Sequence, residues 1–197
     1  EIYNFNELKK YLKQKNIDFF SKSDSEVLLS LWQLKNLECL NDLDGMFAFV
    51  IWDGKKGWVA RDKFGEKPIY YAYEKRGVFI SSELGPLVKV LNKKKILSKK
   101  LTASFFSLGY IPAPYTAYED IFILNPASCL KISKGKVDKK IKYFDFTRSL
   151  QKIPREKKID KDFIDKFHQE LINSIKSRLY SDAPKCLFLS SGVDSSL

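Results

Sequence analysis

Four strand-like segments between Gly45 and Ser82 limit the possible folds of this chain more than any other feature. Aromatic and β-branched residues dominate each segment, and short stretches that contain glycine separate most of them. The segments are Met46–Trp52, Trp58–Arg61, Ile69–Tyr73 and Val78–Ser81. Together they predict an antiparallel meander. The first segment is almost continuously apolar, so we expect helices to cover both of its faces.

Helical patterns flank these strands. Asn4 and Glu7 have the spacing of a capping box before a helix that runs to about Lys15, and Ser23 and Glu26 repeat that spacing before a second helix. The other predicted elements are a short strand at 17–20, helices at 84–91 and 101–108, and strands at 118–124 and 129–133.

Arg61 and Asp62 stand next to each other just before the turn that contains Gly65. A functional ion pair and a structural clamp on a tight connection are both possible interpretations of this pair. The surrounding pattern contains no nucleophile and no base with a partner, so the structural clamp is favoured.

The C-terminal quarter of the chain has a different character. Residues 147–160 are charged, include Pro154 and lack periodicity, which is typical of a linker. Apolar residues then recur at every fourth position from Phe163 to Leu179, which predicts a helix of about twenty residues. An apolar run of strand length follows and ends at Leu189.

The seven residues Ser190–Ser196 have the composition of a phosphate-binding turn. Gly192 would let the backbone approach an anion closely, and the four serines offer hydroxyl and amide donors. Asp194 would repel a phosphate unless a divalent cation lay between them, which implies Mg²⁺. An ordinary serine-rich turn before a helix accounts for the same seven residues equally well.

Composition restricts the class of protein. The chain has 197 residues, 44% of them hydrophobic, and no uninterrupted apolar run that would span a membrane. Its three cysteines are far apart, which indicates buried, reduced thiols and a cytoplasmic location. The net charge of +11 suggests a nucleic-acid-binding module. The lysines occur in short scattered groups, however, so a solvated surface is favoured and neither nucleic acid nor membrane is expected as a partner.

Seven motifs, in order, resemble the glutamine-hydrolysing asparagine synthetase family. They are Glu1-Ile-Tyr-Asn4, Ser23-Asp-Ser-Glu26, Asp44-Gly-Met-Phe-Ala-Phe49, Arg61-Asp-Lys-Phe-Gly-Glu-Lys-Pro68, Ser82-Glu-Leu84, Gly109-Tyr-Ile-Pro-Ala-Pro114 and Ser190-Ser-Gly-Val-Asp-Ser195. The resemblance implies an α+β fold: an N-terminal-nucleophile-type αββα antiparallel sandwich, the glutaminase domain, over residues 1–146. A linker at 147–160 and the first helix, strand and loop of an α/β PP-loop nucleotide domain at 161–197 would follow.

The resemblance also implies roles for particular residues. Glu1 and Asp24 would face the α-ammonium group of glutamine. Residues of the C-terminal loop would bind ATP, with Asp194 as the Mg²⁺ ligand; they are Leu189, Ser190, Ser191, Gly192, Val193, Asp194 and Ser195. Glutamine, aspartate and ATP are the implied small-molecule partners. Whether the full-length parent forms a homodimer stays open.

Two departures from the family pattern affect the expected activity. The cysteine nucleophile, the arginine that holds the glutamine carboxylate and the oxyanion-hole residues should all precede Glu1, so we expect a fragment with no catalytic residue. Release of glutamate from glutamine by the purified chain would refute that expectation. Ser191 replaces a glycine of the family loop, and its Cβ should restrict the backbone slightly while nucleotide binding is retained.

The parent reaction implied by the resemblance is ATP-dependent asparagine synthesis. Aspartate, glutamine and ATP would give asparagine, glutamate, AMP and pyrophosphate through an aspartyl adenylate and channelled ammonia. One alternative is a related amidotransferase or cyclase that acts on another carboxylate, as in surface-sugar amidation or β-lactam formation. The basic nucleic-acid-binding module is the less favoured alternative.

Overall fold

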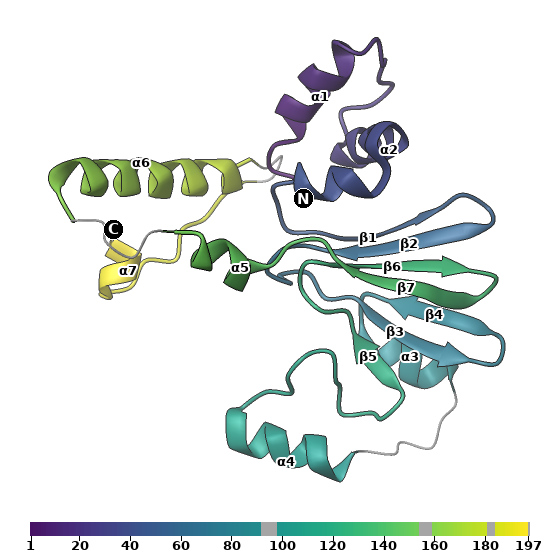
Figure 1. Ribbon diagram of the computed structural model, residues 1–197. Coiled ribbons are helices and arrows are strands. Elements are labelled where there is room, and N and C mark those ends of the chain that lie inside the picture. The colour runs from purple at the N-terminus through teal and green to yellow at the C-terminus, as the bar shows by residue number, and fades with distance from the viewer. Residues whose placement is uncertain (92–97, 154–158, 181–183, 197) are drawn as a thin grey trace. The chain divides into compact units, whose positions relative to one another are not determined.

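The computed structural model describes residues 1–91, 98–153, 159–180 and 184–196 (Figure 1). The chain divides into two compact units, Glu1–Lys152 and Ile153–Leu197. The boundary between them falls within the predicted linker. The first half of that linker is not irregular, because Phe146–Gln151 forms helix α5, whose N-cap residue Asp145 accepts a hydrogen bond from the backbone nitrogen of Arg148.

The first unit contains two antiparallel sheets. The four-stranded sheet has the order β1 (Ala48–Trp52), β2 (Lys56–Arg61), β6 (Ser128–Ser133) and β7 (Lys136–Lys142). The three-stranded sheet has the order β4 (Gly77–Ser81), β3 (Tyr70–Glu74) and β5 (Ile121–Ile123). The four strands predicted between residues 46 and 81 are confirmed.

The predicted meander is wrong, because the chain changes sheet between β2 and β3. β1 and β2 pair as one hairpin and β3 and β4 as another, and the two hairpins lie in different sheets. The connection between them is the turn after Arg61, so a tight turn here joins two layers instead of two neighbouring strands.

Helices and sheets form four layers (Figure 1). Helices α1 (Phe5–Lys13) and α2 (Asp24–Lys35), with the short 3₁₀ helix η1 (Asn36–Asn41), pack on the outer face of the four-stranded sheet. A second apolar cluster lies between the sheets and includes Val59, Leu130, Tyr71 and Leu124. Helix α3 (Leu84–Val90) covers the other face of the three-stranded sheet. This order of layers confirms the expected αββα sandwich.

Alternation along the strands explains why both faces of each sheet are apolar. On β2, Val59 faces the second sheet whereas Ala60 faces the helices, and both side chains are fully buried. The same alternation places Tyr71 between the sheets and Ala72 against α3. A strand buried on both faces therefore has an almost continuous apolar sequence.

Two other expectations in this region are wrong. β1 is an edge strand, and the side chains of Val50 and Trp52 are 49% and 59% exposed, so helices do not cover both of its faces. Residues 17–20 do not form a strand, because the backbone nitrogens of Phe20 and Ser21 donate to the Glu26 carboxylate instead of to a neighbouring strand.

The helix caps agree with the sequence only in part. Ser23 accepts a hydrogen bond from the backbone nitrogen of Ser25 at 3.1 Å, as expected of an N-cap. The Asn4 side chain makes no capping bond; its amide group donates to the Asp42 carbonyl and accepts from the Asp44 nitrogen. Asn4 therefore ties the start of α1 to the segment that leads into β1.

The predicted helices at 84–91 and 101–108 are confirmed as α3 and α4 (Lys99–Leu108), and α4 ends at Gly109 with a left-handed φ of 78°. The predicted strands at 118–124 and 129–133 are observed as β5 and β6. Strand β7 was not predicted. It follows a turn at Lys134 and Gly135, both of which have positive φ angles.

The second unit contains α6 (Lys161–Arg178) and α7 (Val193–Ser196). The predicted long helix is confirmed, whereas the strand predicted at 185–189 is wrong: these residues have no regular structure. Leu187 and Phe188 are 84% and 98% exposed, and Cys186 is exposed as well, in contrast to the buried Cys39 and Cys129. Across the described part of the chain, every helix is too short or too polar to span a bilayer.

Candidate functional site

The first three residues lie against the segment that precedes β1. The backbone nitrogen of Glu1 donates to the Met46 carbonyl at 2.8 Å, and that of Tyr3 donates to the Asp44 carbonyl at 2.7 Å. Between them, Ile2 and Gly45 form an antiparallel bridge. Gly45 has a φ of 151°, and a Cβ atom there would lie only 2.3 Å from the Glu1 carbonyl oxygen. Glycine at position 45 therefore lets the backbone of Glu1 and Ile2 lie close to this segment, which fixes the position of Glu1.

Asp24 is brought to the same place by α2. It is the first residue of that helix, and its Oδ2 atom accepts a hydrogen bond from the Ile2 backbone nitrogen at 3.1 Å. The Ser25 hydroxyl donates to the other carboxylate oxygen at 3.4 Å. Asp24 thus joins the helix layer to the first residues of the chain, in addition to lying at a helix start.

A pocket of about 300 Å³ opens between these elements and the strands. Its polar lining includes Glu1, Asp24, Ser25, Lys67 and Ser82. Its apolar lining includes Leu28, Met46, Phe47, Phe49 and Pro68. The two residues predicted to bind glutamine, which are separated by more than twenty positions in the sequence, therefore meet in one pocket.

The turn that contributes Lys67 and Pro68 is held by a buried aspartate. Asp62 is fully buried, and its carboxylate accepts hydrogen bonds from the backbone nitrogens of Phe64 at 3.1 Å, Glu66 at 3.0 Å and Lys67 at 3.0 Å. Its own backbone nitrogen donates to the carbonyl of Phe47, another lining residue, at 2.9 Å.

Arg61 holds the same turn from the other side. Its guanidinium donates to the carbonyls of Lys67 at 2.7 Å, Gly65 at 2.6 Å and Leu124 at 2.5 Å, so it satisfies three backbone acceptors. Burial lowers the pKa of the Arg61 guanidinium from its ordinary value, and the nearby Asp62 opposes this shift. The interpretation of this pair as a structural clamp is confirmed.

The chemistry of the pocket suits the binding of an amino acid. Two carboxylates can accept charge-assisted hydrogen bonds from one ammonium group, and the cationic Lys67 also belongs to the lining. The described lining contains two serines but neither a cysteine nor a histidine that could activate a nucleophile. As described, the pocket can bind and orient a ligand, but it contains no activated nucleophile of its own.

Sequence reasoning missed Lys67 and Ser82 as pocket residues. Both belong to motifs that contributed to the resemblance, Arg61–Pro68 and Ser82–Leu84, but neither motif received a ligand-binding role. The spacing of the motifs alone could not show that these segments converge on Glu1.

The predicted ATP-binding loop lies in the second unit. The Ser190 hydroxyl donates to the Ser195 hydroxyl at 2.8 Å, and the Gly192 nitrogen donates to the Ser190 hydroxyl at 3.3 Å. Leu189 and Val193 are largely exposed, and Ser191 is exposed as well. The side chain of Asp194 lies outside the described residues, and those that are described contain no cluster of metal-ligating side chains. The nucleotide and Mg²⁺ roles of this loop stay predictions.

Comparisons with known proteins identify the domain family of the first unit. The sequence profile of the glutamine amidotransferase domain matches residues 1–144. A putative glutamine-hydrolysing asparagine synthetase 2 of Methanocaldococcus jannaschii is 35% identical over 200 residues, which cover 100% of this chain and 38% of that protein. Glutamine-hydrolysing asparagine synthetase 1 of Bacillus subtilis is 32% identical over 198 residues, covering 100% of this chain and 30% of that protein.

Among solved structures, glutamine phosphoribosylpyrophosphate amidotransferase from B. subtilis matches with a TM-score of 0.49 and 20% identity, over 73% of this chain and 27% of that one. The chain spans only 38% and 30% of the length of the two curated relatives described above. On the match of residues 1–144, the chain belongs to the glutamine amidotransferase domain family, and its curated relatives include glutamine-hydrolysing asparagine synthetases.

Proposed function

We propose that the first unit binds L-glutamine in the pocket lined by Glu1 and Asp24 and takes part in glutamine-dependent amide transfer. The observation that carries this proposal is that Glu1 and Asp24 line the same pocket, with the Asp24 carboxylate bound to the backbone nitrogen of Ile2, the neighbour of Glu1. Family membership supports the same substrate, because the domain family is named for glutamine amide transfer.

In the proposed complex, the α-ammonium of glutamine donates to the Glu1 and Asp24 carboxylates. Hydrogen bonds between two charged groups are about twice as strong as neutral ones. Loss of one such bond costs about 1.5–3 kcal/mol, which corresponds to a loss of affinity of about 10- to 150-fold. A substrate without the ammonium group should therefore bind poorly.

The test is the release of glutamate from glutamine by the natural protein that contains this chain. The substitution Asp24→Asn should raise KM for glutamine by about 10-fold or more and leave kcat within about threefold, because the lost interaction acts mainly in binding. Asp18→Asn, at an exposed aspartate outside the pocket, is the matched control. An unchanged KM in Asp24→Asn would contradict the proposal.

We further propose that the complete protein uses the released ammonia to make asparagine from aspartate, with ATP and Mg²⁺. This proposal is supported by the names of the curated relatives and by the order of the seven motifs, the last of which is Ser190–Ser195. Asp194 would hold Mg²⁺ and the serines would hold the phosphates.

This second proposal is tested by the products. Asparagine and AMP should form in the natural protein when aspartate, glutamine and Mg-ATP are supplied together. Glutamate release without any asparagine would instead favour a relative that amidates or cyclises another carboxylate.

A further inference from the structure

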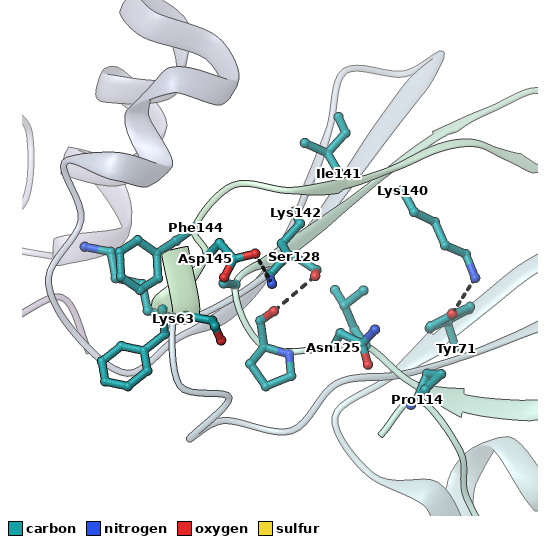
Figure 2. Close-up of a pocket in the computed structure, with 15 residues that line it drawn as sticks. Lys63, Tyr71, Pro114, Asn125, Ser128, Lys140, Ile141, Lys142, Phe144 and Asp145 are labelled. Carbon is teal, nitrogen blue, oxygen red and sulfur yellow. Dashed lines mark hydrogen bonds and ion pairs between the residues drawn. The ribbon is translucent and has the colours of Figure 1, made fainter. Parts of the chain in front are cut away.

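A second pocket lies at one edge of the sandwich, where β7 meets β3 and the turn Asn125–Ser128 (Figure 2). Its volume is about 530 Å³, which falls within the range of about 300–1,000 Å³ that is usual for small-molecule sites. The described residues that line it are all different from those that line the glutamine pocket. Any ligand here would therefore be separate from glutamine.

Two lysines enter this pocket from one face of β7. Lys140 pairs with Leu130 and Lys142 pairs with Ser128, so the two side chains lie on the inner face of the sheet, two residues apart. Figure 2 shows Lys140 reaching Tyr71 and Lys142 reaching Asp145. Lys139 pairs with Lys131 on the opposite face and does not line the pocket.

The contacts of Lys140 keep its ammonium group charged and in place. Its Nζ atom donates to the hydroxyl of Tyr71 at 3.0 Å and lies 5.2 Å from the centroid of that ring, whose side chain is buried. The hydrogen bond to Tyr71 raises the pKa of Lys140, and partial burial opposes this shift. The same Nζ atom lies 5.9 Å from the ring centroids of Tyr73 and Phe122, and a hydrogen bond with Tyr73 also raises the pKa of Lys140. An ammonium group has three donors, so one remains for a ligand.

The rest of the pocket carries a positive charge. Lys142 donates to Asp145 at 2.7 Å, and Lys63 donates to the Leu43 carbonyl at 3.2 Å. Asp145 is the one carboxylate among the described lining residues, and the backbone nitrogen of Arg148 also donates to it. Three lysines against one aspartate leave two positive charges in the pocket.

The uncharged lining is largely apolar. It includes the side chains of Pro114, Leu124, Pro126, Phe144 and Phe146. A bare inorganic ion would leave this surface without a partner, whereas a ligand with an organic body would cover it. The lining therefore combines two net positive charges, which would balance a dianion, with an apolar surface that an organic group can contact.

We propose that this pocket binds a small organic phosphate. Its headgroup lies between Lys140 and Lys142, and its organic body lies against Phe144 and Pro126. A phosphate monoester carries about −1.5 to −2 charges at neutral pH, which matches the positive charge of the pocket. Lysine is a common phosphate ligand because its ammonium acts as a compact point charge with several donors.

The experiment is isothermal titration of the full chain with phenyl phosphate, which has both features of the ligand. Inorganic phosphate supplies the headgroup alone, benzyl alcohol supplies the ring alone, and succinate supplies two carboxylates. Phenyl phosphate should bind at least about tenfold more tightly than the other three, because only it makes both sets of contacts.

Substitutions on β7 locate the site. The double change Lys140→Met with Lys142→Met should weaken the binding of phenyl phosphate roughly 100-fold, since two charge-assisted hydrogen bonds are lost. The matched control is Lys136→Met with Lys139→Met, which removes two charges from the same strand outside the pocket and should change affinity by less than about twofold.

Two further variants distinguish a loss of binding from misfolding and from failure of the glutamine proposal. Lys140→Arg with Lys142→Arg keeps both charges and should retain binding, which excludes simple misfolding as the cause of a loss. Asp24→Asn should also bind phenyl phosphate normally, so failure of this inference is distinguishable from failure of the glutamine proposal. Undetectable binding of phenyl phosphate at about 10 mM, equally strong binding of benzyl alcohol or succinate, or equal losses in the two methionine variants would overturn the inference.

Discussion

Replacing Asp62 with asparagine should destabilise the first unit strongly, although the two side chains have the same shape. The carboxylate is fully buried and accepts three backbone hydrogen bonds, two at Oδ1 and one, from Lys67, at Oδ2. An asparagine oxygen can replace Oδ1, but its NH₂ group would then face the Lys67 N–H. The loss of a charge-assisted bond, at about 1.5–3 kcal/mol, and of a partner for the partly buried Lys67 N–H, at about 1–3 kcal/mol, gives a total of about 2.5–6 kcal/mol.

The measurement is the midpoint of thermal unfolding followed by circular dichroism. For a unit of 152 residues, about 2–4 °C are lost per kcal/mol, so the midpoint should fall by roughly 10 °C. Asp53→Asn is a matched control, because Asp53 also accepts two backbone hydrogen bonds but is exposed. That variant should lose less than about 1 kcal/mol. Equal midpoints for the two variants would refute the reasoning.

Two further predictions concern backbone approach and alkaline stability. Gly45→Ala should push Glu1 away from Met46 and lower the free energy of unfolding by roughly 1–3 kcal/mol. It should also raise KM for glutamine. A normal KM would show that Gly45 does not fix the position of Glu1. Burial raises the pKa of Tyr143, so stability that is present below about pH 10 should fall as pH rises further, by up to about 1.4 kcal/mol per pH unit. Tyr143→Phe should remove that part of the slope in urea unfolding, and an unchanged slope would contradict the assignment.

The sequence predicted most strands of the first unit but not their distribution between sheets. Aromatic and β-branched residues identify β1 to β4 because such residues pack well on a pleated, buried surface. The same composition is compatible with either sheet. The change of sheet after β2 depends on Arg61 and Asp62, whose hydrogen bonds to the turn became visible only in the structure.

Strand β7 illustrates a different failure. Four of its seven residues are lysines, so its sequence resembles a solvated surface segment. Lysine is frequent on edge strands, where it opposes pairing with other chains. The turn at Lys134 and Gly135 was the one local signal of a hairpin, and missing it also concealed the pocket that contains Lys140 and Lys142.

The wrong strand at 185–189 shows the limit of apolar runs as a signal. Such a run indicates a strand buried in a parallel sheet only if partner strands are present. The described part of the second unit contains α6 and α7 but no strand to pair with, and Leu187 is exposed. The apolar residues of α6, such as Phe163 and Phe167, are likewise partly exposed.

The candidate site could be predicted only through the order of motifs. Local sequence around Asp24 indicated no more than a helix start, and nothing near Glu1 indicated a ligand. The structure adds the hydrogen bond between Ile2 and Asp24 and the close approach at Gly45. These long-range contacts bring Glu1 and Asp24 to the same pocket, and no local pattern encodes them.

The most direct test of the account compares L-glutamine with 4-carbamoylbutanoate, which lacks only the α-ammonium group. In the natural protein that contains this chain, glutamine should bind at least about 30-fold more tightly than the analogue, because only glutamine can donate to Glu1 and Asp24. In the variant with both Glu1→Gln and Asp24→Asn, the preference should fall to less than about threefold. An unchanged preference in that variant would show that these two carboxylates do not bind the ammonium group.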